Sequence, residues 1–194
     1  MQYAAFDIET TGLDPHNDRI IELALAAKGI IYSWLINPGI PIEPAITQIT
    51  GITQEMIDSE GVPFATAWEE FSVVSCGYEK FIGHNAFRFD LPFLQSECLR
   101  AGYPKPFIDI IDTAALFKGL AMGVQPKAPH DEWARYVLDV RMYGLKYNLG
   151  FAASELGLTL PDGLHRAGAD AHLTLDVYEA LMQKNPGLEE ILYA

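Results

Sequence analysis

Two carboxylates early in the sequence, Asp7 and Glu9, are spaced so that they could hold a metal ion together. They lie in the stretch Phe6–Leu13, which follows apolar residues and contains a glycine, a pattern typical of a strand that runs into a turn. Alternate side chains of a strand share a face, so both carboxylates point the same way. Their repulsion requires a compensating cation, and ligands made only of oxygen favour Mg²⁺ or Mn²⁺. For a lone Asp-x-Glu a solvent-exposed strand end is the simpler interpretation, so the prediction depends on further buried carboxylates.

Two later aspartates could complete such a site. Asp90 comes directly before a predicted helix, where capping of that helix is an equally good explanation. Asp170 shares the core-facing stripe of the last long predicted helix with Leu173, Thr174, Val177 and Leu181. An unpaired buried carboxylate is costly, so Asp170 requires either a cation or a strong donor, for which Arg166 is the nearest candidate.

A histidine close to the last carboxylate, His165, could act as a base if it lies outside the helix. On a regular helix the spacing from His165 to Asp170 is a rotation of about 140°, so the two side chains would not share a face. The Pro161–Gly163 stretch predicts a loop from which His165 could reach the site. Without that context, a solvent-exposed loop histidine is the default interpretation.

The composition indicates one globular domain over residues 1–194. The chain is 49% apolar and 20% charged, and no apolar run approaches the roughly 20 residues of a membrane span. No leader-like segment is visible. Cys76 and Cys98 give neither a disulfide framework nor a zinc spacing, so we expect two small buried side chains in a reduced, cytoplasmic protein.

The net charge of −13 excludes a protein that coats long nucleic acid, because phosphate binding depends largely on Lys and Arg. The charge is uneven, since residues 80–146 hold nine of the 13 basic but only seven of the 26 acidic residues. Bound divalent cations would neutralise part of the remaining acidity. The composition is therefore compatible with a protein that holds a short nucleic-acid end.

The hydrophobic pattern predicts a mixed sheet with helices on both faces. Strands at 19–27 and 30–36 form a hairpin after the first strand, and an ordered connection with short helical turns covers 37–57. Asp112 is expected to cap a helix. The other predicted helices lie at 64–74, 91–101, 131–139, 148–156 and 168–182, the later strands at 79–83 and 107–111, and an extended loop at 119–131 within a loop-rich insertion at about 119–146.

Three motifs in order resemble the DEDDh branch of the DnaQ-like 3′–5′ exonuclease superfamily. They are Asp7-x-Glu9, Asp90 behind a His-Asn pair, and His165-x₄-Asp170, with Gly51-Ile52-Thr53 and Asp112-Thr113 as further matches. The resemblance covers nearly the whole chain and is weakest over 119–146. It implies an α/β, ribonuclease-H-like fold with a five-stranded mixed sheet flanked by helices.

The same resemblance implies catalysis with two Mg²⁺ ions, for which Mn²⁺ can substitute. Asp7 would bridge the two ions, which in such sites lie about 4 Å apart. Glu9 and Asp170 would hold the ion that activates water, and Asp90 the ion on the leaving-group side. Neutral His165 would take a proton from the attacking water as general base.

The resemblance also names residues that would contact the substrate. Thr11, Gly12 and Leu13 are similar to positions that contact the terminal 3′-hydroxyl and wedge against the last base, and Asn85 is a further candidate. The motif that ends at Asp90 is one residue longer than in typical bacterial proofreading subunits and is similar to TREX-like and some phage-type exonucleases. DNA and RNA therefore both remain open as substrates.

The predicted function is a Mg²⁺-dependent 3′–5′ exonuclease that releases nucleoside 5′-monophosphates from a single-stranded or frayed 3′ end, without a membrane. One alternative is an exoribonuclease that trims RNA 3′ ends. Another is a proofreading subunit with weak activity of its own that is docked on a DNA polymerase, and a homodimer is a further option. A silent relative that only binds is disfavoured because all five catalytic-type residues are present.

Overall fold

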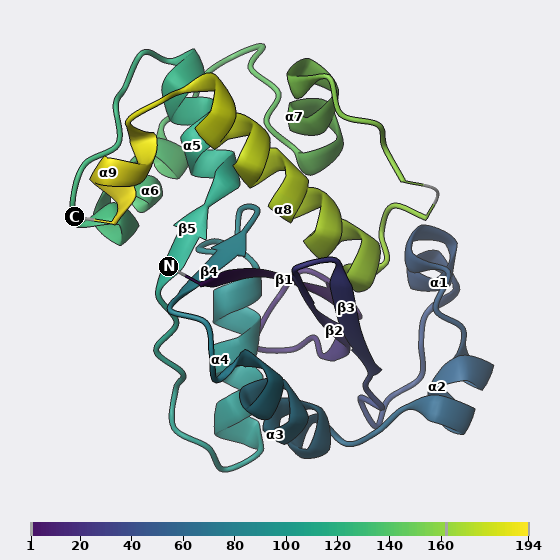
Figure 1. Cartoon of the computed structure of the whole chain (residues 1–194). Coiled ribbons are helices and arrows are strands. Elements are labelled where there is room, and N and C mark those ends of the chain that lie inside the picture. Colours follow the sequence, from purple (N-terminus) through teal and green to yellow (C-terminus); the bar gives the residue numbers. More distant parts are fainter. Residues whose placement is uncertain (1, 162, 194) are drawn as a thin grey trace.

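The computed structural model describes residues 2–161 and 163–193, which contain a five-stranded mixed sheet in the order β3-β2-β1-β4-β5 (Figure 1). The first hairpin is antiparallel throughout, with β1 paired to β2 and β2 to β3, whereas β4 runs parallel to both β1 and β5. This arrangement confirms the predicted mixed sheet. The strands are β1 Tyr3–Thr10, β2 Ile20–Ala27, β3 Ile30–Leu35, β4 Lys80–Gly83 and β5 Ile110–Asp112.

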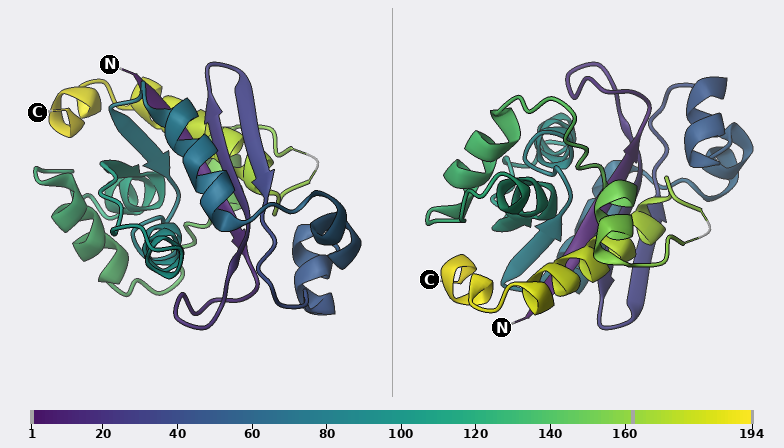
Figure 2. Two further views of the ribbon diagram at one scale, coloured as in Figure 1. Left: turned by 90° about the horizontal axis from the view of Figure 1, so that it is seen from below. Right: turned by 90° about the horizontal axis from the view of Figure 1, so that it is seen from above.

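Helices cover both faces of the sheet, as predicted. The long helix α8 packs across β1 and β2 on one face, with α7 beside it, and α3 and α4 lie on the other face (Figures 1 and 2). The helices are α1 Pro44–Thr50, α2 Gln54–Glu60, α3 Phe64–Ser75, α4 Asp90–Arg100, α5 Thr113–Ala121, α6 His130–Asp139, α7 Leu149–Leu156, α8 Ala167–Lys184 and α9 Leu188–Leu192.

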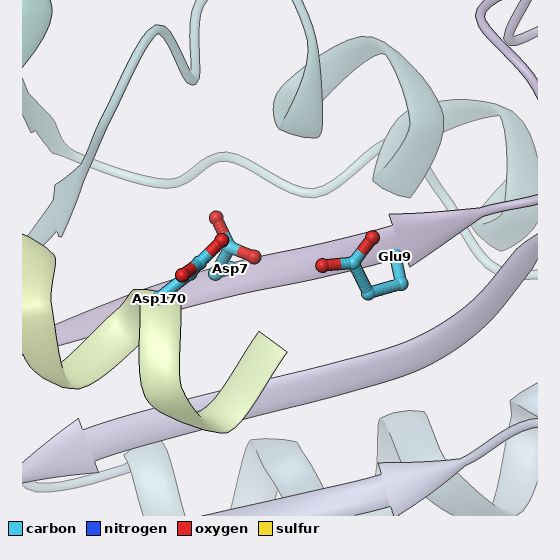
Figure 3. Close-up of side chains that lie close together, drawn as sticks. All are labelled: Asp7, Glu9 and Asp170. Atoms are coloured by element: carbon cyan, nitrogen blue, oxygen red, sulfur yellow. The ribbon is translucent and has the colours of Figure 1, made fainter. Parts of the chain in front are cut away.

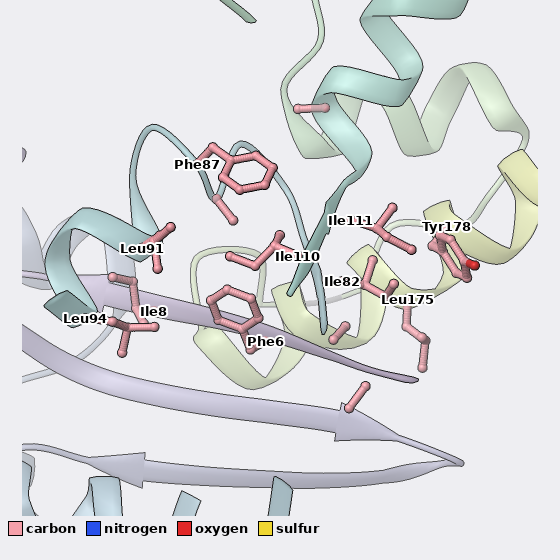
Figure 4. Packing of buried hydrophobic residues seen from close by; sticks show 14 of the residues in the cluster. Phe6, Ile8, Ile82, Phe87, Leu91, Leu94, Ile110, Ile111, Leu175 and Tyr178 are labelled. Atoms are coloured by element: carbon pink, nitrogen blue, oxygen red, sulfur yellow. The ribbon is translucent and has the colours of Figure 1, made fainter. Parts of the chain in front are cut away.

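The alternation of β1 separates the hydrophobic core from the acidic side chains. Phe6 and Ile8 are buried on the α4 side of the sheet, where Leu91 and Leu94 lie close to them (Figure 4). The intervening residues Asp7 and Glu9 point toward α8 (Figure 3). Burial of a Phe or Ile side chain contributes about 1.5–3 kcal/mol, so the register that places both of them in the core also fixes the face on which the carboxylates stand.

Three sequence predictions were wrong in detail, and one short helix was missed. The strand predicted at 107–111 comprises only Ile110–Asp112, and the loop predicted at 119–131 is shorter because α5 continues to Ala121 and α6 begins at His130. The short helix α9 was not predicted. Cys98 is buried as expected, but Cys76 is exposed because it follows the end of α3. Within the predicted loop Pro161–Gly163, Asp162 lies outside the described residues.

Within residues 2–161 and 163–193, none of the helices combines the length and the hydrophobicity that a membrane span requires.

Candidate active site

Asp7, Glu9 and Asp170 converge between β1 and α8 (Figure 3). Each offers one carboxylate oxygen, and these oxygens all lie within 4.8 Å of one another. Asp7 and Glu9 are half-buried, and Asp170 is buried in the first turn of α8. Asp7 and Asp170 thus meet in the fold although 163 positions separate them in the sequence, as predicted for a shared metal site.

Within residues 2–161 and 163–193, Asp170 forms no ion pair with an arginine, the partner that a purely structural role would require. Arg166 pairs with Glu22 instead, through Nε–Oε2 and Nη2–Oε1 contacts of 3.0 and 2.9 Å. Among the described residues, the only side-chain hydrogen bond of Asp170 comes from the backbone N–H of His165, 3.2 Å from Oδ2. Oδ1 of Asp170 is buried without a hydrogen-bond partner in that part of the chain. Such an atom costs about 1–3 kcal/mol unless something binds it.

Glu22 was missed by the sequence analysis, although a single carboxylate within an apolar strand is a visible signal. It lies opposite Glu9 in the β1–β2 ladder and is 1% exposed. It accepts hydrogen bonds from Arg166, from the Ser33 hydroxyl at 2.7 Å and from the Ala167 backbone N–H at 3.0 Å. Burial acts to raise the pKa of Glu22, but these hydrogen bonds outweigh it and the pKa is lowered. Glu22 thus caps the N-terminus of α8 and fixes the turn that presents Asp170.

Asp90 approaches the same site from α4, of which it is the first residue. It is 2% exposed, and its Oδ1 lacks a hydrogen-bond partner within residues 2–161 and 163–193. Burial raises the pKa of Asp90 to about 7, while its own backbone N–H and that of Ile8 in β1 act in the opposite direction. Asp90 is not one of the three residues with oxygens within 4.8 Å of one another, so it borders the cluster rather than joining that group.

The carboxylates raise one another's pKa because they are crowded and poorly solvated. Burial raises the pKa of Asp7 well above its usual range, and the charges of Asp90, Asp170 and Glu9 add to the rise. Burial likewise raises the pKa of Glu9 to about 8, with Asp170 as the strongest charged neighbour. The pKa of Asp170 is raised by burial as well. The site therefore holds more negative charge than the protein itself compensates.

The four side chains fit a divalent metal ion. All of the donor atoms are carboxylate oxygens, the ligands preferred by Mg²⁺ and Mn²⁺. The buried Oδ1 atoms of Asp90 and Asp170, which have no partner among the described residues, are free to accept such a cation. A cation would also relieve the repulsion that raises the pKa of the cluster.

His165 lies in the loop before α8, as predicted, and its side chain is exposed. Its backbone has a φ of 69°, a left-handed conformation that is uncommon for a residue with a Cβ. The hydrogen bond from its N–H to Asp170 holds this conformation and ties the loop to the carboxylate cluster. Strained backbone of this kind is concentrated at functional sites, although its presence does not itself assign a role.

The turn after β1 is firmly held and leaves one apolar side chain exposed. The Thr11 hydroxyl accepts the Arg19 N–H at 2.9 Å and contacts Asp18 at 3.3 Å, so this predicted substrate contact has a structural role as well. A Cβ on Gly12 would lie 2.4 Å from the Asp18 carboxylate, which explains the glycine. Leu13 is 83% exposed, the state required of a side chain that wedges against a base.

Asn85 stands in the turn between β4 and Asp90. The carboxylate of Asp112 accepts the backbone N–H groups of Asn85 and Phe87, as well as that of Ala115, where it caps α5 as predicted. Asn85 adopts a left-handed φ of 62°, and its Oδ1 is buried without a hydrogen-bond partner in the described chain. The turn is thus rigid, with one acceptor left for an external donor.

In the absence of divalent cations, the free energy of unfolding of the protein should decrease as the pH rises from about 7 to about 9. Between these values the folded metal-free protein releases the proton of Glu9 (pKa about 8), a group that is already ionised in the unfolded chain. Because the folded state binds more protons, its free energy of unfolding falls, by about 1 kcal/mol for this group. Burial lowers the pKa of His84 and His130 to about 4, so both titrate below this window.

Urea unfolding in EDTA at several pH values would measure this effect, with Glu9→Gln expected to flatten the slope. Added Mn²⁺ should remove the pH dependence and raise the stability, because it binds only the folded state. A metal-free protein whose stability is constant or rises from pH 7 to 9 would contradict the prediction.

Comparisons with known proteins agree with this geometry. The family model described as Exonuclease matches residues 4–178. The 3′–5′ exonuclease DinG of Bacillus subtilis is 30% identical over 189 residues, which are 94% of this chain and 18% of that protein. The DNA polymerase III subunit epsilon of Treponema pallidum is 30% identical over 185 residues, or 93% of this chain and 76% of that subunit.

The fold is also that of solved exonuclease structures. The crystal structure of E. coli exonuclease I in complex with a dA16 oligonucleotide matches with a TM-score of 0.76 at 19% sequence identity, covering 99% of this chain and 43% of that one. This likeness confirms the predicted ribonuclease-H-like fold. The chain spans less than half of the length of DinG and of exonuclease I.

Proposed function

The chain belongs to the exonuclease family, and from that premise we propose that it is a metal-dependent enzyme that removes nucleotides one at a time from the 3′ end of a nucleic-acid strand. We base this on one observation above all: three carboxylates from β1 and α8 meet within 4.8 Å, and a fourth, Asp90, borders them. A cluster that raises its own pKa so strongly is a poor structural element and a good metal site.

Asp7, Glu9, Asp90 and Asp170 would hold the cations, which we propose to be two Mg²⁺ ions. Bound there, they would lower the pKa of water and offset the charge that develops on the phosphate. The protein supports these ligands from outside the cluster. Glu22 neutralises Arg166 and caps α8, and Asp112 holds the turn before Asp90, so each ligand stands on a fixed element.

His165 is the proposed general base. An imidazole nitrogen of neutral His165 takes a proton from the attacking water, whose oxygen forms a new bond to phosphorus. The bond between phosphorus and the 3′ oxygen of the preceding nucleotide breaks, and that oxygen gains a proton as the new 3′-hydroxyl. The products are a nucleoside 5′-monophosphate and a strand shortened by one nucleotide. The exposed loop position of His165 leaves its ring accessible to water.

The polarity of cleavage follows from the turn beside the carboxylates. We expect monomers as the first products, and we expect a strand with a 3′-phosphate to resist attack. The motivation is the firmly held Thr11–Leu13 turn, whose exposed Leu13 side chain is accessible to the last base of a strand. Chromatography of early products from end-labelled strands would test this expectation. Nicking of a circular single strand at a comparable rate would refute it.

Single-stranded DNA is the substrate that we propose first. E. coli exonuclease I, whose fold this chain shares, was crystallised with a dA16 oligonucleotide. RNA remains the alternative, and parallel assays of matched DNA and RNA strands would distinguish the two. A faster rate on RNA would replace the DNA assignment while leaving the mechanism unchanged.

A second candidate function is proofreading in association with a DNA polymerase. It is favoured by the similarity to a polymerase III epsilon subunit, of which the chain spans 76%. The net charge of −13 also suits a module that a partner delivers to the primer end. Copurification with a polymerase, together with a rate increase on mixing, would support this role. Full activity of the isolated chain would favour an independent enzyme.

A further inference from the structure

The segment Val140–Leu149, between α6 and α7, differs in charge from the rest of this acidic chain. It contains Arg141 and Lys146, and the sequence has no Asp or Glu from residue 140 to residue 154. Both cations are exposed, and Tyr143 between them is 99% exposed. Neither cation forms an ion pair within the described residues. We propose that this segment, the strand track, binds the single strand upstream of the nucleotide that is removed, a role that rests on the proposed function.

A buried lysine fixes the position of the strand track on the protein. Lys118 of α5 is 2% exposed and donates to the backbone carbonyls of Leu138 and Val140 at 2.8 and 2.7 Å. Its ammonium also lies 4.6 Å from the ring centroid of Tyr147. A buried cation held by two carbonyls and a ring fixes the backbone at both ends of the segment. The exposed side chains of Arg141 and Tyr143 therefore extend from a backbone segment that Lys118 holds in position.

Two contacts place the track beside the predicted catalytic residues. His84, which directly follows β4, donates from Nε2 to the carbonyl of Tyr147 at 2.8 Å. Directly after the segment, a Cβ on Gly150 in α7 would lie 4.0 Å from Leu164, the neighbour of His165. The C-terminal part of the segment therefore lies between the turn that precedes Asp90 and the loop that carries His165. In Figure 2, α7 lies beside α8 on the same face of the sheet.

Two hollows flank Tyr147 along this route. One, of about 360 Å³, is lined by Arg141 and Tyr143 among others, and the other, of about 420 Å³, is lined by Asn85 and Lys146. The second hollow thus adjoins the turn in which the Oδ1 of Asn85 lacks a hydrogen-bond partner among the described residues. The Oδ1 of Asn85 could accept a hydrogen bond from the strand close to the active site, and Lys146 and Arg141 could bind its phosphates further away.

The chemistry of the track matches single-stranded nucleic acid. Lys and Arg bind backbone phosphates, and exposed aromatic rings stack on unpaired bases. A solvated charged loop would be the ordinary interpretation of Arg141 and Lys146 alone. Three observations together favour the strand: the absence of Asp and Glu from residue 140 to residue 154 in a chain of net charge −13, the fully exposed ring of Tyr143, and the hydrogen bond that ties the segment to the turn before Asp90. Asp139, which directly precedes the segment, pairs with Arg88 at 3.2 Å.

The test compares a long strand with a substrate that has no upstream nucleotide. We expect the Arg141→Ala/Lys146→Ala variant to raise KM for a single strand of about 20 nucleotides on the order of tenfold at about 0.1 M salt, with kcat unchanged. The slope of log KM against log salt should fall by about 1.4, the value for two lost phosphate contacts. Hydrolysis of the 5′-p-nitrophenyl ester of thymidine monophosphate should be unaffected.

Matched controls separate this inference from the proposed function. Lys105→Ala/Lys127→Ala removes the same charge from two exposed lysines outside the track and should leave KM unchanged. An Arg141→Ala/Lys146→Ala variant with wild-type KM and salt slope would overturn the track. If the wild type cleaved neither substrate, the proposed function would fail. Fluorescence anisotropy with a labelled strand in EDTA would then still test whether the track binds the strand. Equal affinity of wild type and variant in that assay would overturn the track.

Discussion

Replacement of Asp7 by asparagine is expected to abolish hydrolysis and to stabilise the metal-free protein. Asp7 is the member of the cluster whose pKa is raised by burial and by four neighbouring carboxylates, so its charge opposes folding near neutral pH. The same charge is required to hold the cations. Because bound metal supplies several kcal/mol of transition-state stabilisation, kcat/KM should fall by at least about 10³-fold. Steady-state assays with Mg²⁺, and thermal unfolding in EDTA, measure the two effects.

Glu22→Gln is the matched control, because it removes one carboxylate charge from the adjacent strand on the same face. Here the charge is paired, so its loss leaves Arg166 without its partner and weakens the cap of α8. We expect destabilisation of about 2 kcal/mol, opposite in sign to the effect at Asp7. An Asp7→Asn enzyme that retains wild-type activity would remove the metal mechanism, and one that is less stable in EDTA would contradict the electrostatic interpretation.

The sequence was sufficient to predict the faces on which Asp7, Glu9 and Asp170 stand. The two-residue period of β1 separates Asp7 and Glu9 from Phe6 and Ile8, and burial of the apolar pair enforces that choice. The 3.6-residue period of α8 likewise placed Asp170 toward the sheet. In both elements the orientation of the side chains is predicted from a repeated pattern of several residues, so the prediction does not depend on any single residue.

The partners of the buried charges could not be predicted from the sequence. Arg166 was considered as a partner for Asp170 because it is close in the chain, yet it binds Glu22, 144 residues away. The choice depends on how α8 crosses β2, a tertiary feature that local patterns do not contain. The same limit explains the missed α9 and the short β5. The strand β5 is short because only Ile110, Ile111 and Asp112 pair with β4, which itself ends at Gly83.

His165→Ala should slow turnover by about 10²–10⁴-fold, the usual cost of losing a general base. Metal binding should be nearly unchanged, because Asp7, Glu9 and Asp170 keep their mutual positions. The hydrogen bond that Asp170 accepts comes from the backbone N–H of residue 165, so the alanine variant retains it. Alanine also keeps the Cβ, and the left-handed backbone at this position is therefore no more strained than before.

His172→Ala supplies a control on the same helix. His172 is exposed on α8, 3.7 Å from Asp176, and it has no contact with the carboxylate cluster among the described residues. Its replacement should leave turnover unchanged, so a defect specific to His165 cannot be ascribed to general damage to α8. Wild-type turnover of His165→Ala would make that residue an ordinary exposed loop histidine. A loss of Mn²⁺ affinity, measured by titration calorimetry, would instead make His165 a ligand, and the water's proton would then have to pass to another group.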